Sequence, residues 1–278
     1  MRQHRFQQVD VFASVPFGGN PVAVVIDGGG VDDAQMQAFT RWTNLSEATF
    51  LLPPRSPRAD YRVRIFTVDR ELSFAGHPTL GSAHAWLQAG GVPARAGELV
   101  QECEAGLIDI RHAGADLAFA APPLLRTGPV AEDLAKRIVR GLRVDPSRVQ
   151  AMQWVDNGPG WIGVLLDSAH TVLEVGIDRD ELRGFGVGII GAHADGGPAA
   201  YEVRAFYSAD DVFEDPVTGS LNASLAQWLI GAGIAPPRYR AHQGTAMGRA
   251  GMVEVAQDGE RIWIGGACVT RIEGVANF

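Results

Sequence analysis

The sequence has few cysteines and almost no lysine. Only two of its 278 residues are cysteines, Cys103 and Cys268. Two cysteines provide neither a disulfide framework nor a cysteine-based metal site. Lys136 is the only lysine among 24 basic residues, and it lies in an amphipathic segment typical of a surface helix. Schiff-base and pyridoxal-phosphate chemistry need an active-site lysine, so this position argues against both classes.

Long apolar runs and an excess of basic residues are also missing. No apolar run approaches the roughly 18 residues of a membrane-spanning helix. The first residues, MRQHRFQQVDVF, lack the apolar core of a secretory signal. The net charge of −8 argues against binding to nucleic acid. We therefore expect a cytoplasmic protein that binds neither a membrane nor a nucleic acid.

Sequence signals for a metal or a cofactor are equally scarce. The seven histidines show no metal-binding spacing such as H-E-x-x-H. GVGIIG at 186–191 has the letters of the G-x-G-x-x-G dinucleotide motif. However, no long apolar strand precedes it and no helical pattern follows it, so we interpret it as a glycine-rich strand. We expect neither a metal nor a cofactor.

An internal repeat organises the sequence that is present. YRVRIF at 61–66 matches YEVRAF at 201–206, which lies 140 residues later. HPTLGS at 77–82 then matches DPVTGS at 215–220, and a strand–turn–strand segment near the end of each half matches as well. Several matches in the same order predict two copies of one structural unit.

Each copy combines alternating strands with one apolar helix. Period-2 alternation predicts the strands, and the segments after His77 and Asp215 predict helices that run to Ala89 and Ile230. Both helices are apolar or small on nearly all sides, which favours burial. A proline-rich crossover at 120–133 separates the copies. We predict domains at 1–124 and 125–269, with 270–278 returning to the first.

The two strand-to-helix corners carry different polar residues at matching places. His77 and Asp215 each precede a proline that suits a first helical position. Two helix N-termini facing one cleft would attract a small carboxylate, near Gly76–His77 and Gly219–Ser220. The alternative for Asp215 is a purely structural N-cap.

Glu47 is the only charged residue in the apolar strand segment 45–52. A carboxylate in such surroundings suits general acid–base catalysis. An isolated glutamate in a strand is more often an exposed edge residue, and that alternative stays open. Ser46 precedes Glu47 and is a candidate substrate contact.

Four segments in this order resemble the phenazine biosynthesis PhzF-like family, which is structurally similar to diaminopimelate epimerase. They are DVFASVPFGGNPVAVV, NLSEATF, RIFTVDRELSFAGHPTLGSA and EDPVTGS. The resemblance spans essentially the whole chain. It implies an α+β fold with two pseudo-symmetric domains, each a curved, mostly antiparallel sheet (a half-barrel) around a central helix. It also implies a ligand cleft between the domains, cofactor-independent isomerase chemistry and a homodimer.

The family motifs assign roles to individual residues. They place the acid/base glutamate on Glu47 and the cleft histidine on His77, and further cleft residues on Asp215 and Ser220. Cysteine is absent from both helix starts, which excludes the two-thiol mechanism of related epimerases. The counterpart of the Glu47 segment in the second copy also contains no carboxylate.

One carboxylate without a symmetric mate favours a shuttle that removes a proton from one carbon and returns it to another. We therefore predict an isomerase that acts on a small carboxylated substrate; in the member for which the family is named, the substrate is a dihydro-hydroxyanthranilate. The alternatives are an amino-acid epimerase or racemase using Glu47 with Asp215, and a non-catalytic protein that binds a small ligand.

Overall fold

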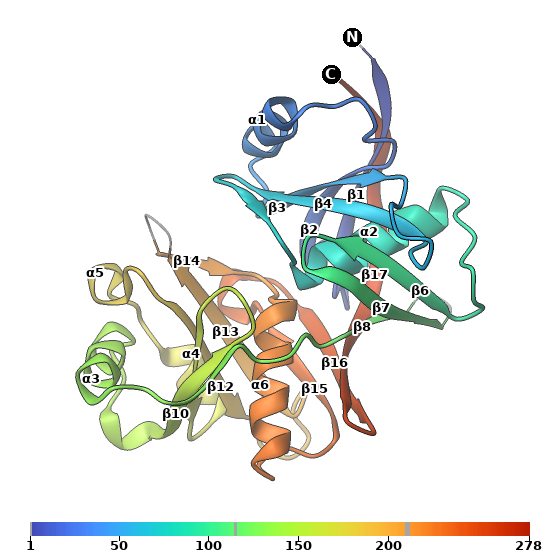
Figure 1. The fold of residues 1–278 in the computed structure, drawn as a ribbon. Helices are drawn as coiled ribbons and strands as arrows, with labels where there is room; N and C mark the ends of the chain where they lie inside the picture. The colour runs from blue at the N-terminus through green and yellow to red at the C-terminus, as the bar shows by residue number, and fades with distance from the viewer. Residues whose placement is uncertain (1, 114–115, 209–211) are drawn as a thin grey trace. The chain divides into compact units, whose positions relative to one another are not determined.

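Strands make up most of the regular structure in the computed structural model, which describes residues 2–113, 116–208 and 212–278 (Figure 1). The chain forms two compact units. Unit 1 comprises Met1–Ala120 and Gly265–Phe278, and unit 2 comprises Ala121–Ile264. The predicted boundaries at 124/125 and 269/270 differ from these by a few residues, because one long strand, β17 (Arg261–Asn277), runs through the second boundary.

The strands of unit 1 pair into a closed ring. They are β1 (Gln3–Val11), β2 (Asn20–Val25), β3 (Glu47–Leu52), β4 (Tyr61–Thr67), β5 (Glu71–Leu72), β6 (Glu98–Cys103), β7 (Gly106–Ala113), β8 (Asp116–Ala120) and the later part of β17. The ring runs β1–β2–β3–β4–β6–β7–β8–β17 and returns to β1. The pairs β2–β3 and β4–β6 are parallel. The two chain ends lie side by side, since Arg2 and Phe278 exchange backbone hydrogen bonds (Figure 1).

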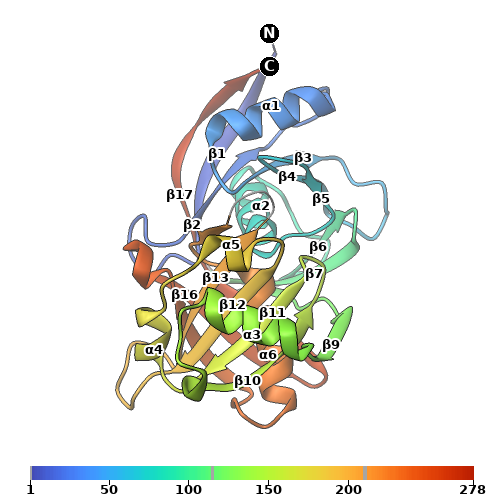
Figure 2. The ribbon, with the colours of Figure 1, turned by 90° about the vertical axis from the view of Figure 1, so that its left-hand side faces the viewer.

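Unit 1 contains two α-helices that differ in their surroundings. Helix α1 (Asp33–Thr43) begins with a capping box, in which Asp32 and Gln35 exchange hydrogen bonds between side chain and backbone. Helix α2 (Gly76–Gln88) is buried on most sides and packs against β1, β2, β3, β6 and β8. Figure 2 looks nearly along α2, with β3, β4 and β6 passing around it. A Cβ atom at Gly81 would lie 2.3 Å from Val22, so glycine allows α2 to approach β2 this closely.

Several strand pairs of unit 2 repeat the order and direction of pairs in unit 1. Its strands are β9 (Arg126–Pro129), β10 (Val149–Asp156), β11 (Trp161–Leu166), β12 (Gly186–Ala192), β13 (Tyr201–Ser208), β14 (Val212–Asp215), β15 (Arg238–Gln243), β16 (Gly251–Asp258) and the start of β17. The pairs β11–β12 and β13–β15 are parallel, as are β2–β3 and β4–β6. GVGIIG forms most of β12, which is the predicted glycine-rich strand. Part of the predicted crossover forms β9, which pairs with β10.

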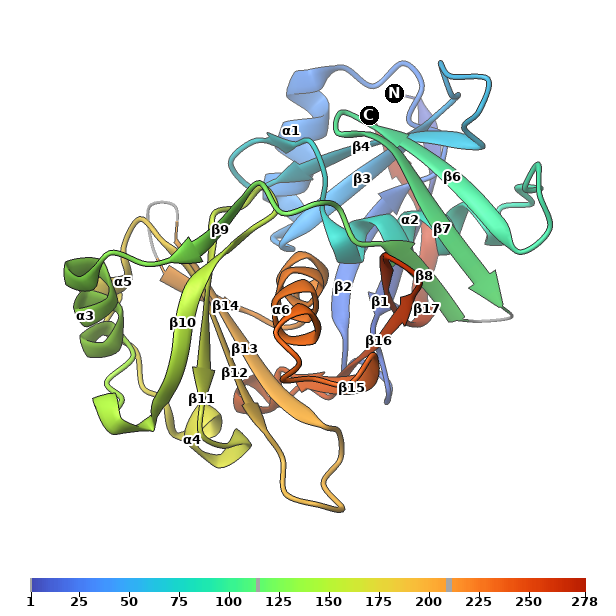
Figure 3. The same ribbon diagram turned by 60° about the horizontal axis from the view of Figure 1, so that its bottom comes forward.

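The helices of unit 2 include one buried helix and several surface helices. They are α3 (Glu132–Gly141), α4 (Ala169–Glu174), α5 (Arg179–Leu182) and α6 (Gly219–Gly231), with short 3₁₀ turns at Pro146–Arg148 and Thr245–Met247. Buried α6 packs against β10, β11 and β16 (Figure 3). Lys136 lies on α3, where its exposed amine pairs with Glu132. Among the described residues, none of the helices combines the length and apolar character that a membrane crossing would require.

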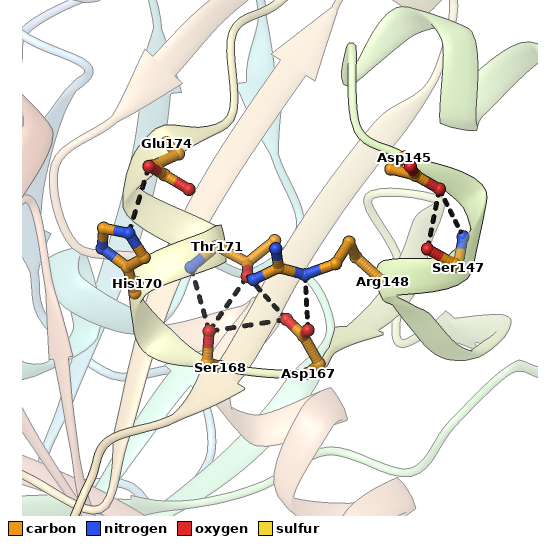
Figure 4. Close-up of polar contacts among 8 residues, drawn as sticks. All are labelled: Asp145, Ser147, Arg148, Asp167, Ser168, His170, Thr171 and Glu174. Carbon is orange, nitrogen blue, oxygen red and sulfur yellow. Dashed lines mark hydrogen bonds and ion pairs between the residues drawn. The ribbon is translucent and has the colours of Figure 1, made fainter.

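A network of side chains holds the start of α4 in unit 2 (Figure 4). Ser168 caps the helix by accepting a hydrogen bond from the Thr171 backbone N–H at 3.1 Å. The Thr171 hydroxyl donates to Asp167 at 2.6 Å, and the guanidinium of Arg148 donates to both Asp167 and Thr171. These partly exposed contacts tie the 3₁₀ turn at Pro146–Arg148 to α4 and are structural.

Both buried helices begin at places that differ from the prediction. The sequence pattern places Pro78 and Pro216 at first helical positions. In the structure α2 already begins at Gly76, so Pro78 is its third residue. Helix α6 begins only at Gly219, three residues after Pro216. Matching letters in the two corners therefore do not occupy matching places in their helices.

Candidate active site

Glu47 is the first residue of β3, and its side chain is 15% exposed. Strand β3 lies between β2 and β4, with Glu47 opposite Thr67. The alternative of an exposed edge residue is therefore wrong. Ser46 immediately precedes the strand and is partly buried. The carboxylate is positioned by an interior strand of a closed ring, which limits its freedom to move.

His77 brings an imidazole to this carboxylate from α2. Its Nε2 atom lies 3.3 Å from Oε2 of Glu47, and its side chain is 5% exposed. Burial lowers the pKa of His77 from 6.5 to about 3, so the ring is neutral at pH 7. The contact is therefore a neutral imidazole beside a carboxylate and not an ion pair.

Asn20 contacts the other nitrogen of the same ring. Its Nδ2 atom lies 3.3 Å from Nδ1 of His77, and Asn20 has no exposed surface. It is the first residue of β2, just after the GGNP turn. Analysis of the sequence missed this residue, although the turn belongs to the first of the four family-like segments.

Further buried hydroxyl and amide groups connect α2 to the surrounding strands. The Ser82 hydroxyl on α2 donates to the Thr49 hydroxyl on β3 at 2.9 Å. Gln101 on β6 donates to the Thr79 hydroxyl at 2.9 Å and accepts from Tyr61 at 3.0 Å. These buried hydrogen bonds fix the rotation of α2 and therefore the direction in which His77 points.

Asp215 ends β14 in unit 2 and is not the N-cap of α6. The N-cap is Thr218, whose hydroxyl donates to the Asp215 carboxylate at 2.5 Å. The Gln243 side chain donates to the Asp215 carbonyl oxygen and to the Thr218 hydroxyl, and it accepts from the Thr218 N–H. The purely structural N-cap alternative for Asp215 is therefore wrong, and Gln243 is a buried organiser of this corner that analysis of the sequence missed.

Gly219 and Ser220 are the first two residues of α6. The Ser220 hydroxyl accepts a hydrogen bond from Trp161 Nε1 at 3.1 Å, and the Ser220 carbonyl oxygen accepts from Asn157 at 2.9 Å. Counted from the helix start, Ser220 corresponds to His77, since each is the second residue of its helix. The predicted equivalence of His77 with Asp215 is wrong for this reason.

A second glutamate–histidine contact lies in unit 2, outside the predicted site. Glu202 is 1% exposed and accepts hydrogen bonds at one oxygen from His193 at 3.1 Å and His242 at 3.2 Å. Its other oxygen accepts from the Thr245 hydroxyl at 2.6 Å. Donors to both oxygens of a fully buried carboxylate are typical of a structural role.

The structure thus brings Glu47 and His77 together in unit 1. In unit 2 it places Asp215 at the end of β14 and Ser220 at the start of α6. Both cysteines are buried, in β6 and β17, and burial raises the pKa of each thiol. In the described part of the chain, no group of three or more His, Cys, Asp or Glu side chains is placed to hold a metal ion. A common cleft for the two sets of residues stays a prediction.

Comparison with known proteins gives a consistent result. A family model described as phenazine biosynthesis-like protein matches residues 9–274. A trans-2,3-dihydro-3-hydroxyanthranilate isomerase of Pseudomonas fluorescens is 34% identical, over 80% of this chain and 78% of the relative. Antisense-enhancing sequence 1 of Schizosaccharomyces pombe is 33% identical over 99% of both chains. A solved PhzF-family phenazine biosynthesis protein from Enterococcus faecalis has a TM-score of 0.82 over 100% of both chains; at 23% identity it shows the fold.

Proposed function

The chain belongs to the phenazine biosynthesis-like protein family and is an isomerase, and from this premise we propose that it moves a proton within a small carboxylated substrate by means of Glu47. The observation that carries the proposal is the contact between the shielded Glu47 carboxylate and a neutral His77. A protonated imidazole at that place would stabilise the carboxylate anion and weaken it as a base. A neutral ring leaves the carboxylate free to gain and lose a proton.

The proposed reaction is a proton transfer in two steps. The Glu47 carboxylate removes a proton from one carbon, and the electron pair of that C–H bond moves into the conjugated system of the substrate. The protonated Glu47 then returns a proton to a different carbon, where a new C–H bond forms. No electrons leave the substrate and no group is lost, so the chemistry requires no cofactor.

We propose that the other residues of the predicted site bind and orient the substrate. We place the substrate carboxylate at the first N–H groups of the two buried helices, at Gly76–His77 and Gly219–Ser220. The positive end of a helix dipole favours an anion there. Asp215 and Ser46 would orient the polar groups of the substrate. The proposal includes a central helix in each of two pseudo-symmetric units, a cleft between them, a homodimer and a cytoplasmic location.

The substrate class follows from the relatives. One relative is named for the isomerisation of trans-2,3-dihydro-3-hydroxyanthranilate, a ring that bears a carboxylate. We propose a substrate of the same kind, in which a proton can move between two carbons of a conjugated system.

Incubation of candidate substrates in D₂O tests the proposal. The panel contains trans-2,3-dihydro-3-hydroxyanthranilate and a set of chiral amino acids, and the products are analysed by proton NMR. A positional isomer with deuterium at the new C–H bond is the expected result. Inversion at a single centre would instead identify an epimerase that uses Glu47 with Asp215. Binding without any exchange would identify a ligand-binding protein.

A further inference from the structure

Asn20 adjoins the pair formed by Glu47 and His77, and it is firmly held in place. It has no exposed surface, and its backbone pairs with Val11 in the β1–β2 ladder. The preceding Gly19 leaves no room for a side chain, since a Cβ atom there would lie 2.1 Å from the Val11 carbonyl oxygen. The Gly19 N–H donates to the Asp10 carboxylate at 2.9 Å.

The Asp10 carboxylate that receives this hydrogen bond is itself anchored. Asp10 is 3% exposed, and its second oxygen lies 3.3 Å from Nε of Arg271 on β17. The turn before β2 is therefore fixed from two strands of the ring. Its rigidity sets the direction of the Asn20 side chain toward α2, 57 residues later in the chain.

The contact between Asn20 and His77 has a defined polarity. An amide nitrogen donates hydrogen bonds and does not accept them. Nδ2 of Asn20 faces Nδ1 of His77 at 3.3 Å, so Nδ1 must be the accepting, unprotonated nitrogen. A neutral imidazole has one N–H, which then lies on Nε2. That nitrogen is the one 3.3 Å from the Glu47 carboxylate.

The opposite orientation of the amide would place two lone pairs against each other. If Oδ1 of Asn20 faced the ring, the hydrogen would have to lie on Nδ1. The unprotonated Nε2 would then direct its lone pair at the Glu47 carboxylate, which is a repulsive contact in a buried place. The arrangement with Nδ2 facing the ring gives each contact a donor and an acceptor.

We propose that Asn20 is a positioning residue that keeps His77 in the tautomer with its hydrogen on Nε2, the nitrogen that lies 3.3 Å from the carboxylate of Glu47. The inference rests on the proposed role of Glu47 as the proton carrier. Asn20 does not touch the reacting atoms. It acts through His77, which in turn holds the carboxylate in one orientation for both proton transfers.

Nitrogen-15 NMR of histidine-labelled protein measures the tautomer directly. The His77 signals are assigned by comparison with the spectrum of the His77→Asn protein. In the wild-type protein we expect a protonated Nε2 and an unprotonated Nδ1. This spectrum alone tests which nitrogen of His77 carries the hydrogen. A wild-type His77 that carries it on Nδ1 would overturn the proposal.

The variant Asn20→Asp tests the consequence for turnover. The carboxylate has the same size as the amide but only accepts hydrogen bonds, so it should draw a proton onto Nδ1. Loss of the favoured tautomer should lower kcat about tenfold, while KM changes little because Asn20 has no exposed surface with which to contact the substrate. The matched control is Asn277→Asp, an exposed residue at the end of β17, which should change neither the spectrum nor kcat.

The outcomes separate this inference from the proposed function. If Asn20→Asp folds, keeps the hydrogen on Nε2 and retains full turnover, Asn20 is not a positioning residue. If Glu47→Gln retains wild-type turnover, the role of Glu47 as proton carrier fails, but the measured tautomer still stands. If Asn20→Asp does not fold, the wild-type spectrum remains the deciding measurement.

Discussion

The two units share a set of polar contacts that the repeat preserves. In unit 1 the guanidinium of Arg64 binds both oxygens of Glu71, at 2.7 and 2.6 Å. In unit 2 Arg204 binds both oxygens of Glu214 in the same way, at 2.9 Å each. Each guanidinium also lies over the phenylalanine two residues later in its strand, about 5 Å from the ring centroid. These arginine–glutamate contacts lie outside the candidate active site and do not depend on the proposed chemistry.

A second contact is similar in the two units, although its threonines occupy different helix positions. The amide of Gln101 donates to the Thr79 hydroxyl at 2.9 Å, and the amide of Gln243 donates to the Thr218 hydroxyl at 3.0 Å. In each unit this bond connects the strand that follows the buried helix to the start of that helix. The glutamine–threonine bonds therefore dock the buried helix in each unit, whereas the arginine–glutamate contacts join neighbouring strands.

The residues of the candidate site do not recur. The strand that begins with Glu47 in unit 1 corresponds to β12, which begins with Gly186. The helix position of His77 holds Ser220 in unit 2. The comparison indicates that the shared contacts maintain the fold, and the proposed function assigns the chemistry to the differing positions. Substitutions in the two classes should therefore have separable effects on stability and on turnover.

The largest expected effect is on turnover in Glu47→Gln. The amide keeps the size of the side chain but cannot exchange a proton, and general acid–base catalysis contributes roughly 10²–10⁴-fold. The value of kcat should fall by at least that range, while substrate affinity stays within about tenfold. Stability should hold or rise, because burial of a neutral amide costs less than burial of a carboxylate.

Kinetic assays and calorimetric binding measure the two effects in Glu47→Gln. The control is Glu98→Gln, an exposed glutamate on β6, which should behave as wild type. Loss of binding without a loss of kcat would place Glu47 among the substrate-binding residues and not in the proton transfer. Asp215 would then be the leading candidate for the proton carrier.

Replacement of the arginine should lower stability more in unit 2 than in unit 1, because the arginine–glutamate pair of unit 2 is more deeply buried. Arg204 and Glu214 are 9% and 15% exposed, whereas Arg64 and Glu71 are 22% and 30% exposed. Arg204→Met leaves a buried carboxylate and removes the donor to the carbonyl oxygens of Val172 and Val175, so it should cost about 3–5 kcal/mol. Arg64→Met should cost about 1 kcal/mol, closer to the value of a surface pair.

Urea unfolding of the two arginine variants checks this difference. Each variant is compared with its lysine counterpart, Arg204→Lys or Arg64→Lys, which keeps the charge but loses the two-point contact. Turnover of the folded fraction should stay near wild type in all four proteins. Equal losses of stability at the two positions would contradict the role assigned to burial.

The sequence predicted many of the strands and both apolar helices, but it predicted the register between them wrongly. The alternating strands and the two apolar helices were evident from YRVRIF, YEVRAF and the segments after His77 and Asp215. The register failed because HPTLGS and DPVTGS match in letters at an offset of 138, whereas the helices begin 143 residues apart, at Gly76 and Gly219. Proline, glycine, serine and threonine favour turns and helix starts in general, so their matching letters do not fix a register.

Asn20 shows what the sequence could not supply. A Gly-Asn-Pro segment between two strands predicts a turn, and the asparagine in it needs no further explanation. Its contact with His77 depends on the depth at which α2 packs against β2, which the close approach at Gly81 sets. That packing is tertiary and has no local signature. Glu47, in contrast, is visible in the sequence as a single charge in an apolar strand, and the family resemblance assigned it the acid/base role.

A further expected effect concerns pH and again separates the two units. Burial lowers the pKa of His77 to about 3 in the folded protein, compared with about 6.5 in the unfolded chain. Between about pH 3 and pH 6.5 the unfolded chain binds more protons than the folded protein. The contribution of His77 to the free energy of unfolding is therefore fully present above pH 6.5 and is lost as the pH falls. The loss should be about 1.4 kcal/mol per pH unit below pH 6.5. Ser220, at the corresponding position in unit 2, has no such titration.

The variant His77→Asn isolates this contribution. The stability of wild type relative to His77→Asn should decline between pH 7 and pH 5 with the slope of one proton, measured by urea unfolding at each pH. Burial also lowers the pKa of His84, but that residue is present in both proteins, so its effect cancels in the comparison. The control His170→Asn makes the same substitution at an exposed imidazole on α4, 76% accessible. A difference between wild type and His77→Asn that stays constant over this range would mean that His77 titrates normally, and the neutral ring beside Glu47 would have to be abandoned.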